Sequence, residues 1–143
     1  MPAIAQQLVA DAPRDQDPRE LLERAPAALR TFFRIAQAWE LRSADERLLL
    51  GSPVESTFYR WRNGQSTGGV TPDTMERLSH AVGIYAALHR IFLDDARADQ
   101  WLRRPNDAPL FGGQPPLAYL SHGRVADLID VRRFLEYVAE GGL

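Results

Sequence analysis

The amino-acid sequence predicts an all-α protein, and three observations support this class. Apolar residues recur at intervals of three and four along most of the chain, the spacing of one helix face. Several of these segments follow residues that favour a helix start. No segment alternates apolar and polar residues as a half-buried strand would. We therefore expect a helical bundle that contains a tight helix-turn-helix and closes with a small helical module.

The composition excludes several protein classes. The chain has 143 residues, 45% hydrophobic and 25% charged, which suits one globular domain or two very small ones. It has no cysteine, so we expect neither disulfides nor a cysteine-based zinc site. We identify no secretory signal and no apolar run that could span a bilayer, so we expect a cytoplasmic protein that does not contact a membrane.

The N-terminal segment is expected to be loosely ordered before the first helix. We expect residues 1–26 to form a flexible arm and lead-in, because the apolar residues of this segment show only a weak pattern and the segment contains Pro2 and Pro13. The first helix is expected from about Ala27 to Leu41. Its apolar face would consist of Leu29, Phe32, Phe33, Ala36 and Trp39.

Two short helices are predicted next. Residues 43–46 have the pattern of a capping box, before a helix that ends at Gly51. Residues 52–55 repeat the pattern with Pro53 at the first helical position, before a helix to Asn63. Because two residues separate these helices, they form a helix-turn-helix, which can present its second helix to a DNA major groove.

The second of these helices is the candidate DNA-reading helix. Val54, Phe58 and Trp61 are spaced to face the core. The side chains predicted to contact DNA are Ser56, Thr57, Tyr59, Arg60 and Arg62. The alternative is a solvated helix in a structural bundle. A specific DNA site usually needs two reading heads roughly 34 Å apart, so we expect a dimer or a larger assembly.

A long helix begins at residues 71–73, where Thr-Pro-Asp supplies a cap, a first-turn proline and an acid. Gly83 interrupts it and is a candidate point of division. Asp94 or Asp95 would cap a further helix to Arg104. The apolar face of the long helix comprises Met75, Leu78, Val82, Tyr85, Leu88 and Phe92.

The last third combines a Trp-Leu helix end, a Gly/Pro-rich turn and a helix from Arg124 to Glu140. Trp101 is expected to pack in the core, whereas the position of Phe111 in the turn leaves core and interface open. The apolar face of the final helix would comprise Val125, Leu128, Ile129, Leu135 and Val138. Its solvated face would carry Arg124, Asp127, Arg132, Arg133, Glu136 and Glu140.

No catalytic, metal or cofactor site is predicted. The three histidines have no metal-ligand spacing. The carboxylate pairs at 94–95 and 127–130 are explained by helix capping and by a solvated face. No Gly-rich phosphate loop follows a strand, because no strand is predicted.

Both halves of the chain, from about Leu29, resemble one family, the Xre/MbcA/ParS antitoxins. The residues that carry the resemblance in the first half are Leu49, Gly51, Thr57, Tyr59, Trp61, Arg62, Gly64, Arg77, Leu78, Gly83, Ile84, Tyr85 and Leu88. Those in the second half are Trp101, Leu102, Pro105, Asn106, Phe111, Gly113, Pro115, Gly123, Val131, Leu135 and Gly141. The second set is the more specific one, because unrelated regulators share helix-turn-helix patterns.

The resemblance implies an all-α fold with an Xre-like helix-turn-helix domain over residues 27–93 and a toxin-binding domain over 94–143. It implies a cognate RES-domain toxin that consumes NAD or transfers ADP-ribose from it. The antitoxin would occlude that toxin's active site, catalyse nothing and repress its own operon by binding operator DNA, as a homodimer or a toxin-bridged hetero-oligomer. The alternative is a stand-alone transcriptional regulator whose C-terminal domain dimerises.

The predicted toxin contacts share a position in the last third of the chain. They are Trp101, Asn106, Phe111, Arg132, Arg133, Gly141, Gly142 and Leu143. Our hypothesis is that the two glycines free the chain before Leu143, whose terminal carboxylate enters the toxin's NAD cleft in place of a pyrophosphate charge. The alternative is an ordinary frayed terminus.

Overall fold

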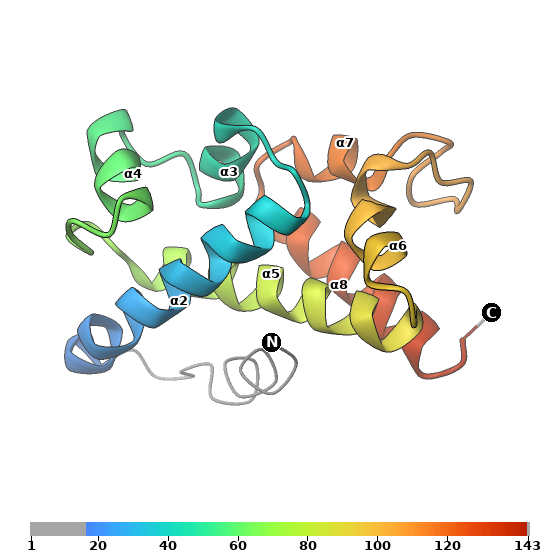
Figure 1. Ribbon diagram of the computed structural model, residues 1–143, viewed down its shortest axis with the longest axis horizontal. Helices are drawn as coiled ribbons and strands as arrows, with labels where there is room; N and C mark the ends of the chain where they lie inside the picture. Colours follow the sequence, from blue (N-terminus) through green and yellow to red (C-terminus); the bar gives the residue numbers. More distant parts are fainter. Residues whose placement is uncertain (1–16, 143) are drawn as a thin grey trace.

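The computed structural model describes residues 17–142, and every regular element within them is a helix (Figure 1). The predicted all-α class is confirmed. In chain order the elements are α2 (Pro18–Ala38), α3 (Ser43–Leu49), α4 (Glu55–Arg62), α5 (Pro72–Ile91), α6 (Asp95–Gln100), the 3-10 turn η1 (Trp101–Arg103), α7 (Pro116–Leu120) and α8 (Val125–Ala139). None of the helices in this part of the chain is long and apolar enough to cross a membrane.

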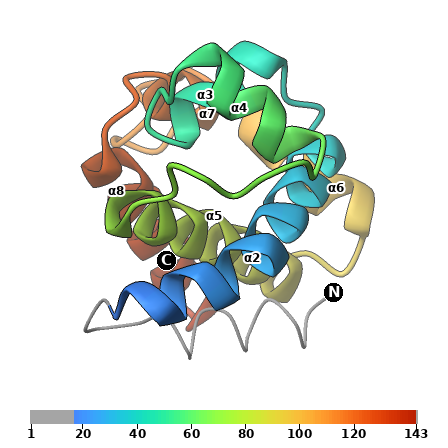
Figure 2. The same ribbon diagram turned by 90° about the vertical axis from the view of Figure 1, so that its left-hand side faces the viewer.

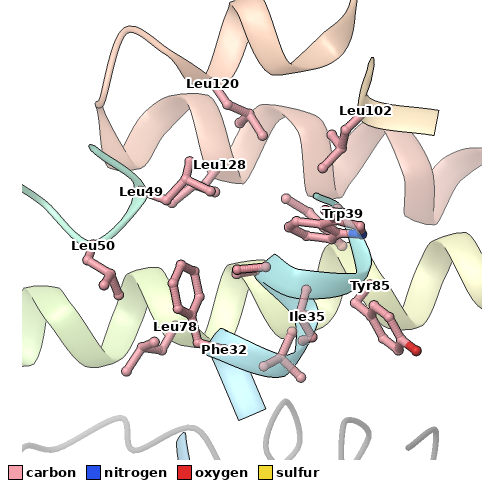
Figure 3. Packing of buried hydrophobic residues seen from close by; sticks show 14 of the residues in the cluster. Phe32, Ile35, Trp39, Leu49, Leu50, Leu78, Tyr85, Leu102, Leu120 and Leu128 are labelled. Atoms are coloured by element: carbon pink, nitrogen blue, oxygen red, sulfur yellow. The ribbon is translucent and has the colours of Figure 1, made fainter. Parts of the chain in front are cut away.

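Helix α5 is the central element of the fold. It packs against α2, α6 and α8, and α3, α4 and α7 lie on the other side of the molecule (Figures 1 and 2). The buried side chains form one cluster to which both predicted domains contribute (Figure 3). Phe32 and Leu78 from the first half lie in the same core as Leu120 and Leu128 from the second.

Helix α2 begins earlier than the predicted start at Ala27. The Asp17 side chain caps it by accepting a hydrogen bond from the Arg19 backbone N at 2.9 Å, and Pro18 occupies the first position, where no N–H is needed. The expected flexible lead-in is therefore wrong for residues 18–26. The rest of the predicted arm, residues 1–16, lies outside the described residues.

Neither predicted capping box forms around the helix-turn-helix. Helix α3 begins at Ser43 itself, so Arg42 occupies the cap position and makes no side-chain cap bond, while the Ser43 hydroxyl accepts a hydrogen bond from Arg62. Helix α4 begins at Glu55, so Pro53 lies in the turn, where its carbonyl accepts from Arg47 Nε at 2.6 Å. The turn is therefore longer than two residues. Val54, predicted to face the core, is 65% exposed.

Helix α5 starts as predicted but is not divided. Thr71 caps it, and Thr71 and Thr74 form a reciprocal capping box. Gly83 lies within a continuous helix and is buried. A Cβ at this position would lie 2.5 Å from Arg132 Nε on α8, so the glycine allows a close crossing.

The C-terminal elements agree in part with the prediction. Asp94 caps α6 by accepting from the Ala96 backbone N at 3.0 Å, and the predicted helix to Arg104 consists of α6 followed by η1. The final helix was predicted to within one residue at each end, because Arg124 and Glu140 are its caps and the helix spans Val125–Ala139. Helix α7 was not predicted: it lies within the expected Gly/Pro-rich turn.

Candidate partner-binding surfaces

Helix α4 is anchored to the fold by two buried aromatic side chains. Phe58 packs against Phe33 of α2, with ring centroids 6.0 Å apart. Trp61 is buried, and its Nε1 donates a hydrogen bond to the Gly68 carbonyl at 2.8 Å. These anchors are the core-facing positions that the sequence predicted for Phe58 and Trp61.

The predicted DNA contacts have different surroundings on α4. Ser56, Tyr59 and Arg60 are exposed. Thr57 is half-buried. It lies close to Gly69 in the loop after α4: a Cβ added to Gly69 would be 3.2 Å from Thr57 Cγ2. The Arg60 side chain has no hydrogen bond or ion pair within residues 17–142, so its guanidinium is available to a partner.

Arg62 is directed back toward α3. Its Nη1 donates to Ser43 Oγ at 3.0 Å, and its Nε lies 3.7 Å from Glu46 Oε1. The Glu46 carboxylate is buried, and this burial raises its pKa while Arg62 acts in the opposite direction. The structure therefore places only part of the predicted DNA set on a free surface.

An aromatic cluster organises the C-terminal third. Trp101 stacks on Phe134 with centroids 6.2 Å apart, and Phe111 meets both rings edge to face at 5.6 and 5.4 Å. Tyr119 adds a further edge-to-face contact with Phe111 at 6.1 Å. Phe111 is 5% exposed, so of the two alternatives left open by the sequence, the ring occupies the core. The expectation that it stands out as an interface anchor is corrected.

The loop that carries Phe111 is closed by its own backbone. Asn106 N donates to the Gln114 carbonyl at 3.2 Å, and Gly113 N donates to the Asn106 carbonyl at 2.8 Å. The Asn106 side chain accepts from the Ala108 backbone N at 2.9 Å. Gly113 has φ +86°, a conformation that suits glycine. The Asn106 side chain thus shapes the loop, and this closure folds Phe111 back onto the core.

The two arginines predicted on α8 differ in exposure. Arg132 is half-buried: its Nε donates to Glu136 Oε1 at 3.0 Å, and its Nη1 lies 3.2 Å from His80 Nδ1 across Gly83. The prediction that Arg132 stands on a solvated face is therefore wrong. Arg133 is exposed and has no ion pair or hydrogen bond within the described residues.

Buried or engaged polar side chains fix the start of α8. Asp127, predicted on the solvated face, is 1% exposed and accepts from the Arg124 backbone N at 3.2 Å. It also pairs with Arg124 Nη2 at 2.9 Å. Tyr119 donates to Asp130 Oδ2 at 2.6 Å, and this hydrogen bond raises the pKa of Tyr119. The Tyr119–Asp130 bond joins α7 to α8, and the Arg124–Asp127 contacts cap α8.

The glycines after α8 form a helix cap. Gly141 has φ +94° and its N donates to the Val138 carbonyl at 3.0 Å, while Gly142 N donates to the Tyr137 carbonyl at 2.9 Å. This is the bonding pattern of a Schellman motif. The prediction that the two glycines free the chain is therefore wrong, because both are bonded to the last turn. Leu143 lies outside the described residues.

Sequence reasoning missed three of the residues that build this region. Phe134 and Tyr119 complete the aromatic cluster, and a proline at the first position of α7 was the available signal for the helix that carries Tyr119. His89 lies between Asp95 and Asp99, with ring nitrogens 3.1 and 2.9 Å from their oxygens, and joins α5 to α6. In the described part of the chain, no three His, Asp or Glu side chains are placed to hold a metal ion.

The fold and these surfaces define an all-helical protein in which two short helices precede a small module built on an aromatic cluster. Residues 87–141 match the sequence model of a family described as the antitoxin Xre/MbcA/ParS C-terminal toxin-binding domain. A Sinorhizobium fredii (strain NBRC 101917 / NGR234) protein named Uncharacterized protein y4oB is 45% identical over 124 residues, covering 86% of this chain and 92% of that protein. No solved structure matches the chain.

Residues 87–141 therefore belong to the C-terminal toxin-binding domain family of the Xre/MbcA/ParS antitoxins. Such a domain implies a cognate toxin as partner. Antitoxin domains of this family are typically non-enzymatic.

Proposed function

We propose that this protein is the antitoxin of a type II toxin-antitoxin system and neutralises a cognate RES-domain toxin by covering its active site. The observation that carries the proposal is the match of residues 87–141 to a toxin-binding domain. The resemblance of the chain to antitoxins whose toxins consume NAD or transfer ADP-ribose supports the choice of toxin.

Toxin binding is assigned to residues 94–143. Arg133 is suited to a direct contact, because it is exposed and its charge is unpaired within the described residues. The half-buried ring of Trp101 adds apolar surface, and Gly141 and Gly142 end α8 directly before Leu143 in the sequence. Arg132, Asn106 and Phe111 support this surface from inside through the contacts described above.

Repression of its own operon is assigned to residues 27–93, with α4 as the reading helix. Ser56, Tyr59 and Arg60 are exposed on α4, and arginine binds both phosphate and guanine. A homodimer or a toxin-bridged assembly would provide two copies of α4, which the spacing of DNA half-sites requires.

The experiment first asks whether a gene adjacent to this one encodes a RES-domain protein, and then co-expresses that protein with this chain. We expect a stoichiometric complex on purification, restored growth and restored cellular NAD. If the two proteins do not copurify and toxicity persists, the antitoxin function is wrong. A free homodimer that binds the promoter tightly and does not bind the toxin would instead support the stand-alone regulator.

A further inference from the structure

Glu46 and Arg62 form an ion pair between the two helices of the helix-turn-helix. Glu46 lies on α3 and is 4% exposed, whereas Arg62 is the last residue of α4. Arg62 Nε lies 3.7 Å from Glu46 Oε1, and Arg62 Nη1 donates to Ser43 Oγ at 3.0 Å. One guanidinium therefore reaches two side chains of the neighbouring helix.

The buried carboxylate needs this cation. Within residues 17–142, Glu46 Oε1 accepts no hydrogen bond. Burial raises the pKa of Glu46, Arg62 lowers it and the adjacent Asp45 raises it. A buried carboxylate that lacks both hydrogen bonds and an opposite charge is strongly unfavourable. Arg62 therefore compensates a charge that α3 would otherwise bury unpaired.

Helix α4 has other anchors that do not involve this pair. Phe58 and Trp61 are buried, and Trp61 Nε1 binds the Gly68 carbonyl. These contacts keep α4 attached to the fold when the ion pair is removed. Variants of Glu46 and Arg62 are therefore expected to fold.

We propose that Arg62 is a positioning residue: its contacts with Glu46 and Ser43 set the orientation of α4 against α3, and Arg62 itself does not contact DNA. The proposal rests on the proposed DNA-binding function and replaces the role that the sequence suggested for Arg62. The Arg62 side chain is 44% exposed, but its guanidinium is paired with α3. Contacts with phosphates and bases fall to the exposed and unpaired side chains of α4, of which Arg60 carries a charge.

The first test needs no DNA and measures urea unfolding of the full chain. Arg62→Ala should lower the midpoint, because it leaves the Glu46 carboxylate unpaired, and adding Glu46→Gln should restore most of the loss. The matched control is Arg60→Ala on the same helix, because the Arg60 side chain has no partner within the described residues. Arg60→Ala and Glu46→Gln should be additive. Additive losses for Arg62→Ala and Glu46→Gln would overturn the proposal.

The second test measures binding to a duplex of the promoter region before this gene and to a random duplex of equal length, over a salt series. Arg62→Ala should weaken binding without changing the log–log salt slope, and Glu46→Gln should restore part of the affinity. Arg60→Ala should lower the slope by about 0.9, the value for one lost phosphate contact. The same fall for Arg62→Ala would contradict the positioning role.

The two tests separate the proposal from the function on which it rests. If the wild-type chain binds neither duplex, the proposed DNA-binding function fails. The coupling between Glu46 and Arg62 in the unfolding experiment then still decides whether the pair holds α4 on α3.

Discussion

At the scale of single residues, pairing divides the arginines into those that tie two elements together and those with a free surface charge. Arg77 donates to Asp73 at 2.8 Å and to the Gly123 carbonyl at 2.9 Å, so it joins α5 to the turn before α8. Arg62 and Arg132 have comparable roles between other elements. The side chains of Arg60 and Arg133 are exposed and unpaired within the described residues, so each is suited to a contact with a partner.

We expect Arg133→Glu to weaken toxin binding roughly tenfold, because it reverses a surface charge assigned to the interface. The stability of the free antitoxin should change by no more than about 0.5 kcal/mol, since the side chain is exposed. Affinity for the purified toxin measures the first effect and urea unfolding the second. The control is Arg34→Glu, the same charge change on the exposed side of α2. Equal effects of both variants on affinity would contradict the assignment.

The pH dependence of stability provides a second prediction at this scale. Burial lowers the pKa of His80, and the neighbouring Arg132 lowers it further, while Glu76 and Glu136 act in the opposite direction. The folded-state pKa thus lies below the unfolded value of 6.5, so the unfolded chain takes up the proton first. The free energy of unfolding should therefore fall as pH drops below 6.5. It should fall less in His80→Gln, measured by urea unfolding between pH 7 and 5. Parallel curves would refute this.

At the scale of elements, the crossing of α5 and α8 determines how the two halves of the protein meet. Gly83 of α5 lies under the Arg132 side chain of α8, and a Cβ there would approach the guanidinium to 2.5 Å. The same guanidinium binds His80 and Glu136. The sequence pattern suggested a helix break at Gly83, but the glycine serves the contact between two helices.

Gly83→Ala is expected to destabilise the fold by about 1–3 kcal/mol, although alanine favours helix, because the methyl group displaces Arg132. The cost should shrink in an Arg132→Ala background, where the obstructing side chain is absent. Thermal or urea unfolding of the four proteins of this cycle provides the measurement. A stabilising Gly83→Ala substitution would mean that the crossing is looser than the structure shows.

At the scale of the whole molecule, one core joins the parts predicted as separate domains. The toxin-binding match begins at residue 87, inside α5, and α5 packs against helices of both halves. Leu49 of α3 and Leu120 of α7 belong to the same buried cluster (Figure 3). A substitution that weakens the packing of one half should therefore also destabilise the other half.

We expect a single cooperative unfolding transition for the full chain. Helix content from circular dichroism and tryptophan fluorescence should report the same midpoint, because Trp39 and Trp61 lie in the first half and Trp101 in the second. Leu120→Ala, in the second half, should lower both midpoints together, at a cost of about 2–5 kcal/mol. Two separate transitions would instead support independent domains.

The helices with strong local signals were predictable from the sequence. The apolar spacing and the Thr-Pro-Asp start located α5, and the closing helix was placed within one residue at each end. The local signals for helix starts and breaks gave wrong predictions where a residue distant in sequence contacts the same position. Ser43 was predicted to cap its helix, but it is the first helical residue and its hydroxyl accepts from Arg62. Gly83 was predicted to break its helix because Arg132, which lies over it, is remote in sequence.

The sequence by itself determined the all-helical class, the long helices and the resemblance to an antitoxin, because helix periodicity and family residues are recorded in local order. Only the tertiary structure decided which of the candidate contacts are free. Phe111 and Asp127 are buried, Arg132 is tied to His80, and Gly141 closes a helix. The physical reason is that burial and pairing depend on groups far apart in the chain, which no local pattern encodes.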